Sequence, residues 1–266
     1  MDDQEVAKYW DENAPEWIRG VRAGYDLYRD YLNNPAFLSM LPDLSGKRVL
    51  DVGCGEGYNT RIFADLCEEI VGTDISEKMV DAAREAEAAE PQGIKYYSAS
   101  GNDLSMFENG SFDGVVSTMA MMDMADYEGC IGECGRVLKT GGLLQFSIHH
   151  PITMTRHWKW ITGKEAERVG VVVGNYFGLH PSKTRDDVEE WFFASAPPEV
   201  RAKARPFQIP RFFRTFSEYF NPLSEAGFDV VQVGGPYADS KTAQECPYVA
   251  DTRIVPLFMI FQCRKR

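Results

Sequence analysis

Hydrophobic and polar residues alternate along the chain with two periods. Short apolar runs, typical of buried strands, are separated by stretches in which apolar residues recur every three or four positions, typical of helices. The short runs predict strands over residues 47–52, 69–74, 94–98, 112–117, 143–149, 228–234 and 256–263. The longer period predicts helices over residues 6–17, 25–40, 59–67, 76–90, 126–138 and 217–226. Because continuous apolar strands alternate with helices, we expect an α/β protein whose mostly parallel sheet is covered on both faces.

The alternation breaks over residues 151–215, where prolines and tryptophans are frequent and no regular order of elements is evident. We therefore expect an insertion at the ligand-binding edge of the sheet. Its many aromatic side chains indicate an apolar or aromatic ligand. The aromatic residues and histidines of this segment are His157, Trp158, Trp160, Tyr176, Phe177, His180, Trp191, Phe192 and Phe193.

A glycine-rich loop follows the first predicted strand, which ends in Asp51. Gly53, Gly55 and Gly57 stand at every second position, so the backbone can turn sharply and approach a ligand. The next helix points its free N–H groups at the same place, which predicts a nucleotide-binding crevice. The dinucleotide fingerprint has a third glycine where this chain has Tyr58. This spacing favours a ligand without a pyrophosphate.

Charge and composition exclude several classes of protein. The net charge of −12 disfavours a nucleic-acid partner. The first residues lack the features of a secretion signal, and no apolar run is long enough to span a bilayer. Six cysteines without disulfide or Cys-x-x-Cys spacing predict reduced thiols in a cytoplasmic protein. The four histidines lack the spacing of a zinc site, so no metal is expected.

Four segments in a fixed order carry a family resemblance. They are residues 49–57 with the glycine loop, 72–76 with Asp74, 110–116 and 136–142. Over residues 45–150 the chain resembles the class I S-adenosylmethionine-dependent methyltransferases, in particular the small-molecule family that includes quinone-biosynthesis enzymes. The resemblance implies a Rossmann-like, doubly wound sheet of seven strands. It also implies that the chain has four parts: an N-terminal helical lid over 1–45, an S-adenosylmethionine-binding core over 46–150, a substrate-specificity insertion over 151–215 and the C-terminal part of the sheet over 216–266.

The resemblance also implies roles for individual residues. The three loop glycines lie against the methionine part and the ribose, and Asp51 supports the loop or the ligand's ammonium. Asp74 accepts both ribose hydroxyls, and Ile75 packs on adenine. A carboxylate can accept two hydroxyl donors, although an acidic residue is also common at a helix N-terminus. Tyr9, Trp10 and Trp17 belong to the lid, or simply anchor their helix to the sheet.

The adenine edge departs from the family pattern. Many members have an acidic residue just after the third strand, where this chain has Ser100. Ser100, the backbone N–H of Gly101 or Asn102 are the candidates to replace it, with Asp103 as a further alternative. On the methyl side, the methionine-rich run from Met119 follows the fourth strand and is expected to line the pocket. Asp123 within that run is expected as a solvent-facing cap, with binding of an acceptor amine as the alternative.

His149 and His150 are the candidates for catalysis. They end the fifth predicted strand, where open α/β sheets bind ligands, and an imidazole can serve as a general base near neutral pH. Alternatively, they only cap an extended turn that Pro151 imposes. Because the leaving group needs no proton, much of the catalysis can come from aligning the reactants in a dry site.

The predicted function is transfer of a methyl group from S-adenosyl-L-methionine to an O, N or C atom of a small molecule, with S-adenosyl-L-homocysteine as product. The acceptor is expected to be apolar or aromatic, and the protein a monomer or homodimer. Two alternatives are a non-catalytic S-adenosylmethionine-binding module and an NAD-dependent oxidoreductase, which would share the fold but not the loop spacing.

Overall fold

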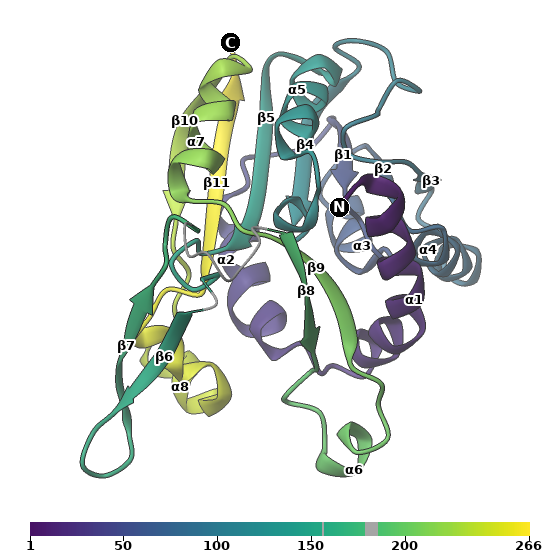
Figure 1. The fold of residues 1–266 in the computed structure, drawn as a ribbon. Coiled ribbons are helices and arrows are strands. Elements are labelled where there is room, and N and C mark those ends of the chain that lie inside the picture. The colour runs from purple at the N-terminus through teal and green to yellow at the C-terminus, as the bar shows by residue number, and fades with distance from the viewer. Residues whose placement is uncertain (156, 179–185) are drawn as a thin grey trace.

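The protein is built around a seven-stranded sheet with the order β10-β11-β5-β4-β1-β2-β3 (Figure 1). The computed structural model describes residues 1–155, 157–178 and 186–266, so His180 lies outside the described residues. Neighbouring strands are parallel except at β11, which runs antiparallel to β5 and β10. The strands are β1 Arg48–Val52, β2 Glu69–Asp74, β3 Lys95–Ser98, β4 Phe112–Thr118, β5 Leu138–His149, β10 Phe228–Gly234 and β11 Phe258–Lys265. The predicted α/β fold with a seven-stranded, mostly parallel sheet is confirmed.

Helices cover both faces of the sheet (Figure 1). Successive strand residues point to opposite faces, so Val49 belongs to one buried cluster and Leu50 to the other. The cluster of Val49 is closed by residues of α2 Asn34–Met40, α3 Tyr58–Ala64 and α4 Glu77–Ala89. The cluster of Leu50 is closed by α5 Tyr127–Val137 and α7 Phe216–Glu225.

Several predicted boundaries differ from the structure. β5 begins at Leu138, directly after α5, whereas the pattern predicts a helix over 126–138 and a strand from 143, with Gly141 and Gly142 between them. Gly141 has a φ of +77°, and the pairing of β5 with β4 shifts register here, so the glycines form a bulge inside the strand. The helix predicted over 59–67 ends at Ala64, and the strand predicted over 256–263 is β11 Phe258–Lys265.

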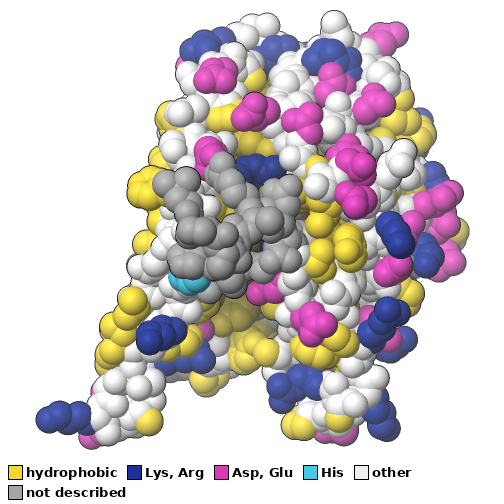
Figure 2. Space-filling view, in the orientation of Figure 1, with side chains coloured by type: hydrophobic (Ala, Val, Ile, Leu, Met, Phe, Trp, Pro, Cys, Tyr) yellow, Lys and Arg dark blue, Asp and Glu magenta, His cyan; other side chains and the backbone are white. Residues whose placement is uncertain are grey.

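The described residues between 151 and 215 form two antiparallel ribbons, although the sequence pattern predicts no regular elements there. β6 His157–Thr162 pairs with β7 Arg168–Gly174, and β8 Asp186–Trp191 pairs with β9 Phe207–Phe212. Most described residues of β6 and β7 are partly or fully exposed, so burial does not impose a clean alternation on their sequence. Between β8 and β9 lies the short helix α6 Pro198–Arg201. Figure 2 shows an apolar hollow between the β6–β7 ribbon and the end of the β8–β9 ribbon that carries α6.

The N-terminal segment lies over the carboxyl ends of the parallel strands. Its first helix, α1 Asp3–Arg22, is longer than the predicted 6–17 and begins with a capping box of Asp2 and Glu5. The helix predicted over 25–40 divides into a π-helical turn, η1 Arg29–Asn33, and α2. The remaining short elements are η2 Met121–Asp123, α8 Ser240–Glu245 and η3 Pro247–Arg253. Across the described ranges, no helix is long and apolar enough to cross a membrane.

Candidate active site

The glycine loop joins β1 to α3 and faces a cavity beneath α1. The N–H groups of Gly53 and Cys54 both donate to the carbonyl of Thr73, at 2.7 and 2.9 Å, which holds the loop against β2. Gly53 has a φ of +75°, and a Cβ built on it would lie 2.3 Å from the Cβ of Ala120. Gly55 has a φ of +56°, and a Cβ there would meet nothing within 4 Å. Both glycines line the cavity, so the loop is tight on its Ala120 side and open at Gly55.

Asp74 places a fixed carboxylate at the end of β2. Its Oδ2 accepts the N–H of Gly55 at 2.8 Å, and its Oδ1 accepts the N–H of Ser76 at 2.9 Å. Burial raises the pKa of Asp74 to about 6, against the effect of these two hydrogen bonds, so the carboxylate is ionised at neutral pH. Each oxygen keeps acceptor capacity for a further donor. Asp74 and Ile75 both line the cavity.

Asp51 and Gly57 lie outside the lining of the cavity. The Asp51 side chain is completely buried, and its Oδ2 accepts the hydroxyl of Thr60 in α3 at 2.7 Å. Burial raises the pKa of Asp51 to about 7, with a smaller contribution from the charge of Asp74. This geometry suits support of the loop, one of the two roles expected for Asp51.

The residues after β3 meet the start of α1. Ser100 and Gly101 line the cavity, whereas Asn102 and Asp103 do not. The hydroxyl of Ser100 donates to the Oδ2 of Asp3 at 2.7 Å, and Asp3 is itself a lining residue. An acidic side chain therefore stands beside the loop after β3, but it comes from α1. The sequence alone does not indicate Asp3, because an aspartate in the first turn of a helix is commonplace.

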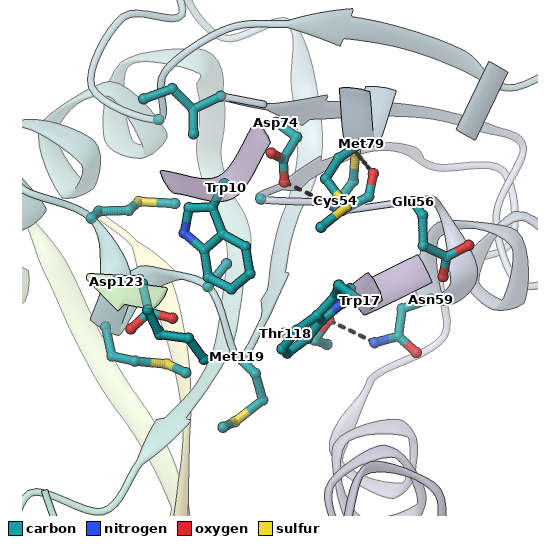
Figure 3. Close-up of a pocket in the computed structure, with 18 of the residues that line it drawn as sticks. Trp10, Trp17, Cys54, Glu56, Asn59, Asp74, Met79, Thr118, Met119 and Asp123 are labelled. Carbon is teal, nitrogen blue, oxygen red and sulfur yellow. Dashed lines mark hydrogen bonds between the residues drawn. The ribbon is translucent and has the colours of Figure 1, made fainter. Parts of the chain in front are cut away.

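Aromatic side chains of α1 and β8 enter the cavity. Trp10 and Trp17 line it, with ring centroids 5.3 Å apart in an edge-to-face arrangement, and Trp191 lies 5.9 Å from Trp17. Figure 3 shows both α1 indoles projecting among the other lining side chains. The side chain of Asn13 fastens α1 to β9, because it donates to the carbonyl of Gln208 and accepts its N–H, each at 2.9 Å. Helix α1 and the ribbon of β8 and β9 therefore cover the cavity together.

His149 lines the cavity at the end of β5, next to the loop that begins at Met119. Its ring stacks on Phe258 with centroids 5.4 Å apart. Burial, and secondarily the charge of Arg211, lower the pKa of His149 to about 3, so the imidazole is neutral at neutral pH. His150 is not a lining residue; its Nδ1 accepts the N–H of Ile152 at 3.2 Å, which stabilises the turn after β5.

Asp123 is buried and ion-paired, so the expected solvent-facing position is wrong. Its Oδ1 lies 3.0 Å from Nη1 of Arg211 in β9, and Nε of Arg211 lies 2.9 Å from Oε2 of Glu189. Burial raises the pKa of Asp123 to about 6, against the attraction of Arg211. The sequence alone does not indicate Arg211, because nothing in the local pattern of β9 links it to η2.

The cavity carries more acidic than basic groups. Among the described lining residues are five carboxylates and two guanidinium groups, from Asp3, Asp26, Glu56, Asp74, Asp123, Arg29 and Arg211. This balance favours a ligand with positive charge over an anion. Within the described ranges, no group of three or more His, Cys, Asp or Glu side chains is placed to hold a metal ion.

Comparisons with known proteins agree with this geometry. The family model described as a methyltransferase domain matches residues 50–146. An uncharacterized protein of Haemophilus influenzae is 25% identical over 237 residues, which are 87% of this chain and 86% of that protein. A ubiquinone biosynthesis O-methyltransferase of Xanthomonas oryzae is 31% identical over 140 residues, 53% of this chain and 55% of that enzyme. The match to the latter therefore spans about half of its length.

The same fold occurs in an S-adenosylmethionine-dependent methyltransferase from Mesorhizobium loti. Its crystal structure is 26% identical in sequence, with a TM-score of 0.69, and the superposition covers 87% of this chain and 96% of that one. The residues that match the family model contain the glycine loop, Asp74 and the loop after β4, which form one side of the cavity. Residues 50–146 thus match a methyltransferase domain, and the chain has the fold of S-adenosylmethionine-dependent methyltransferases.

Proposed function

We propose that this protein transfers a methyl group from S-adenosyl-L-methionine to a neutral, aromatic small molecule and releases S-adenosyl-L-homocysteine. The observation that carries the proposal is the Asp74 carboxylate, which is fixed by two backbone N–H groups, open to the cavity and next to the exposed face of Gly55. When bound, S-adenosylmethionine supplies an electrophilic methyl group on a sulfonium.

The loop side of the cavity would hold this cofactor. Asp74 would accept the ribose hydroxyls, Ile75 would pack on adenine, and Gly53 and Gly55 would lie along the methionine part. The five lining carboxylates suit a ligand that carries a sulfonium and an ammonium. At the adenine edge, Ser100 and the N–H of Gly101 would be joined by a carboxylate from α1.

Asp3 would be that carboxylate. Its Oδ2 already accepts the Ser100 hydroxyl, and it lines the cavity beside Gly101. A carboxylate has further acceptor capacity for an exocyclic amine. Binding of the cofactor would then fasten the start of α1 over the site.

The lid side of the cavity would hold the methyl acceptor. Trp17, Trp191, Phe258 and Met119 give it flat, apolar walls that exclude water and align the acceptor with the methyl group. The surplus of carboxylates disfavours an anionic acceptor. The segments 1–45 and 151–215 would act as one cover, since Asn13 joins them.

His149 would orient the acceptor at the end of β5. Its ring lines the cavity, and a neutral imidazole has one ring nitrogen that can accept a hydrogen bond from an acceptor O–H or N–H. With its pKa lowered to about 3, the imidazole would orient the acceptor through this hydrogen bond and would not take up its proton as a general base. His150 would act on the turn that holds His149, not on the acceptor.

Transfer of a labelled methyl group tests the proposal. The protein is incubated with S-adenosylmethionine labelled on the methyl group and with a fractionated metabolite extract. We expect label in small, neutral aromatic compounds and none in nucleic acid; because the relative from Xanthomonas oryzae is named an O-methyltransferase, phenols are the first pure acceptors to assay. Cofactor binding without transfer to any fraction would support the non-catalytic alternative.

A further inference from the structure

Arg29 is a cavity-lining residue whose guanidinium keeps two nitrogens available to a ligand. It is the first residue of η1, and its side chain is 10% exposed. Its Nε donates to Oδ1 of Asp30 at 2.8 Å, whereas Nη1 and Nη2 have no hydrogen-bond partner among the described residues. Neither nitrogen belongs to the unpartnered side-chain atoms that are sealed from solvent, so a ligand can reach both. In the other lining guanidinium, Arg211, Nε and Nη1 are already paired with Glu189 and Asp123.

The ring of Tyr58 holds this guanidinium beside the glycine loop. The Cζ of Arg29 lies 3.8 Å from the centroid of the Tyr58 ring, and Tyr58 also lines the cavity. A guanidinium that stacks its face on an aromatic ring keeps its N–H edge free for hydrogen bonds in its own plane. Gly55 lines the same cavity three positions before Tyr58. The free edge of Arg29 therefore stands near the part of the loop along which the methionine part of the cofactor would lie.

Two lining carboxyl groups, from Asp26 and Glu56, lie near the same guanidinium. Oδ1 of Asp26 accepts the backbone N–H of Arg29 at 3.1 Å, and Oε2 of Glu56 lies 3.5 Å from Nε of Arg22. Burial raises the pKa of both carboxyl groups; the charge of Arg29 opposes this for Asp26, and the charges of Arg22 and then Arg29 oppose it for Glu56. A cation and two carboxyl groups at one end of a cavity suit an α-amino acid, which carries a carboxylate and an ammonium on one carbon.

We propose that Arg29 binds the α-carboxylate of the cofactor and thereby selects S-adenosylmethionine over adenosine derivatives that lack this group. Nη1 and Nη2 would donate side by side to the two carboxylate oxygens, a bidentate arrangement that is both strong and specific. The ammonium would lie toward Asp26 or Glu56. Because Arg29 belongs to η1 and Asp3 to α1, the N-terminal segment would contact the cofactor at both of its ends. This inference rests on the proposed function, because it assigns the amino-acid tail of the same cofactor.

Calorimetric titration with two matched probes tests the inference. S-adenosylhomocysteine carries the α-carboxylate, whereas its decarboxylated form keeps the adenine, ribose, thioether and amine. Wild type should bind S-adenosylhomocysteine roughly 10- to 100-fold more tightly, as expected for hydrogen bonds between charged groups. In Arg29→Met, which keeps an apolar stem, the two probes should bind within about twofold of each other, because only the affinity for S-adenosylhomocysteine falls. Arg211→Met removes the other lining guanidinium and should keep the preference of wild type.

A second variant separates the loss of the contact from a defect of folding. Arg29→Lys keeps the positive charge but loses the planar fork, so its preference for S-adenosylhomocysteine should fall between those of wild type and Arg29→Met. The decarboxylated probe reports on the rest of the site, and its affinity should be the same in wild type and in both Arg29 variants.

Three results would overturn the inference. Equal binding of the two probes by wild type would mean that the protein does not bind the carboxylate. A preference that persists in Arg29→Met would mean that Arg29 only neutralises Asp26 and Glu56, and an equal loss of affinity for both probes would give Arg29 a purely structural role. Failure of the proposed function is recognised separately. Wild type would then bind neither probe, or would bind S-adenosylmethionine without transferring its methyl group, and the second result leaves the role of Arg29 intact.

Discussion

The ion pair between Asp123 and Arg211 joins η2 to β9, and its contribution to the free energy of unfolding can be measured. The Asp123 carboxylate is 6% exposed and the Arg211 side chain 12% exposed. Removing one member of a buried pair leaves an uncompensated charge and costs about 3–5 kcal/mol of the free energy of unfolding. For a chain of 266 residues, about 2 °C of melting temperature is lost per kcal/mol. Arg211→Met, which keeps the apolar stem, should therefore lower the melting temperature by roughly 6–10 °C.

Glu189 provides the matched control. It contacts the same guanidinium at 2.9 Å but is 51% exposed. An exposed pair contributes about 0–1 kcal/mol, so Glu189→Gln should lower the melting temperature by less than roughly 2 °C. Differential scanning fluorimetry of the three proteins at pH 8 makes the comparison. Equal losses in the two variants would refute the argument that burial makes the Asp123–Arg211 ion pair more stabilising than the exposed Glu189–Arg211 pair.

The pH dependence of this effect has a definite sign. The folded-state pKa of Asp123 is raised to about 6, so its contribution to the free energy of unfolding falls as the pH rises from about 4 to 6. Arg211 lowers the pKa of Asp123. In Arg211→Met this pKa should rise further, so the loss of stability with rising pH should continue to higher pH. The difference between wild type and Arg211→Met should therefore be large at pH 8 and small at pH 5. A larger difference at pH 5 would contradict the assignment.

Two further predictions concern the glycine loop and the cover. Gly53→Ala should destabilise the protein by about 1–3 kcal/mol more than Gly46→Ala, because both positions have positive φ but only Gly53 meets the Cβ of Ala120; equal chemical denaturation curves would contradict this. Asn13→Ala removes two hydrogen bonds to Gln208 and should speed amide exchange at Gln208, whose N–H donates to Asn13, by at least about tenfold. Unchanged exchange there would mean that packing alone holds α1 to β9.

The sequence predicts the core because burial imposes its pattern there. β2 Glu69–Asp74 and β10 Phe228–Gly234 lie at the residues predicted for them, and Asp74 is placed correctly at the end of β2. Periodicity fails where a strand is largely exposed, as in β6 and β7, or where the backbone is irregular. The ribbons of residues 151–215 and the bulge at Gly141 are examples of this failure.

The cavity's polar contacts could not be predicted in the same way. Asp123 and Arg211 are 88 positions apart, and Asp3 and Ser100 are 97 apart. A hydropathy pattern indicates which residues are buried, but it carries no information on which distant residue meets them.

Calorimetric binding of S-adenosylmethionine and NAD to wild type and to Asp74→Ala tests the central claim most directly. Asp103→Ala is the control, since Asp103 also follows a sheet strand but does not line the cavity. S-adenosylmethionine should bind wild type and Asp103→Ala alike. The loss of two charge-assisted hydrogen bonds in Asp74→Ala should weaken that binding by at least about a hundredfold, and NAD should bind none of the three proteins. Binding of NAD alone, or unchanged affinity of Asp74→Ala for S-adenosylmethionine, would contradict the account.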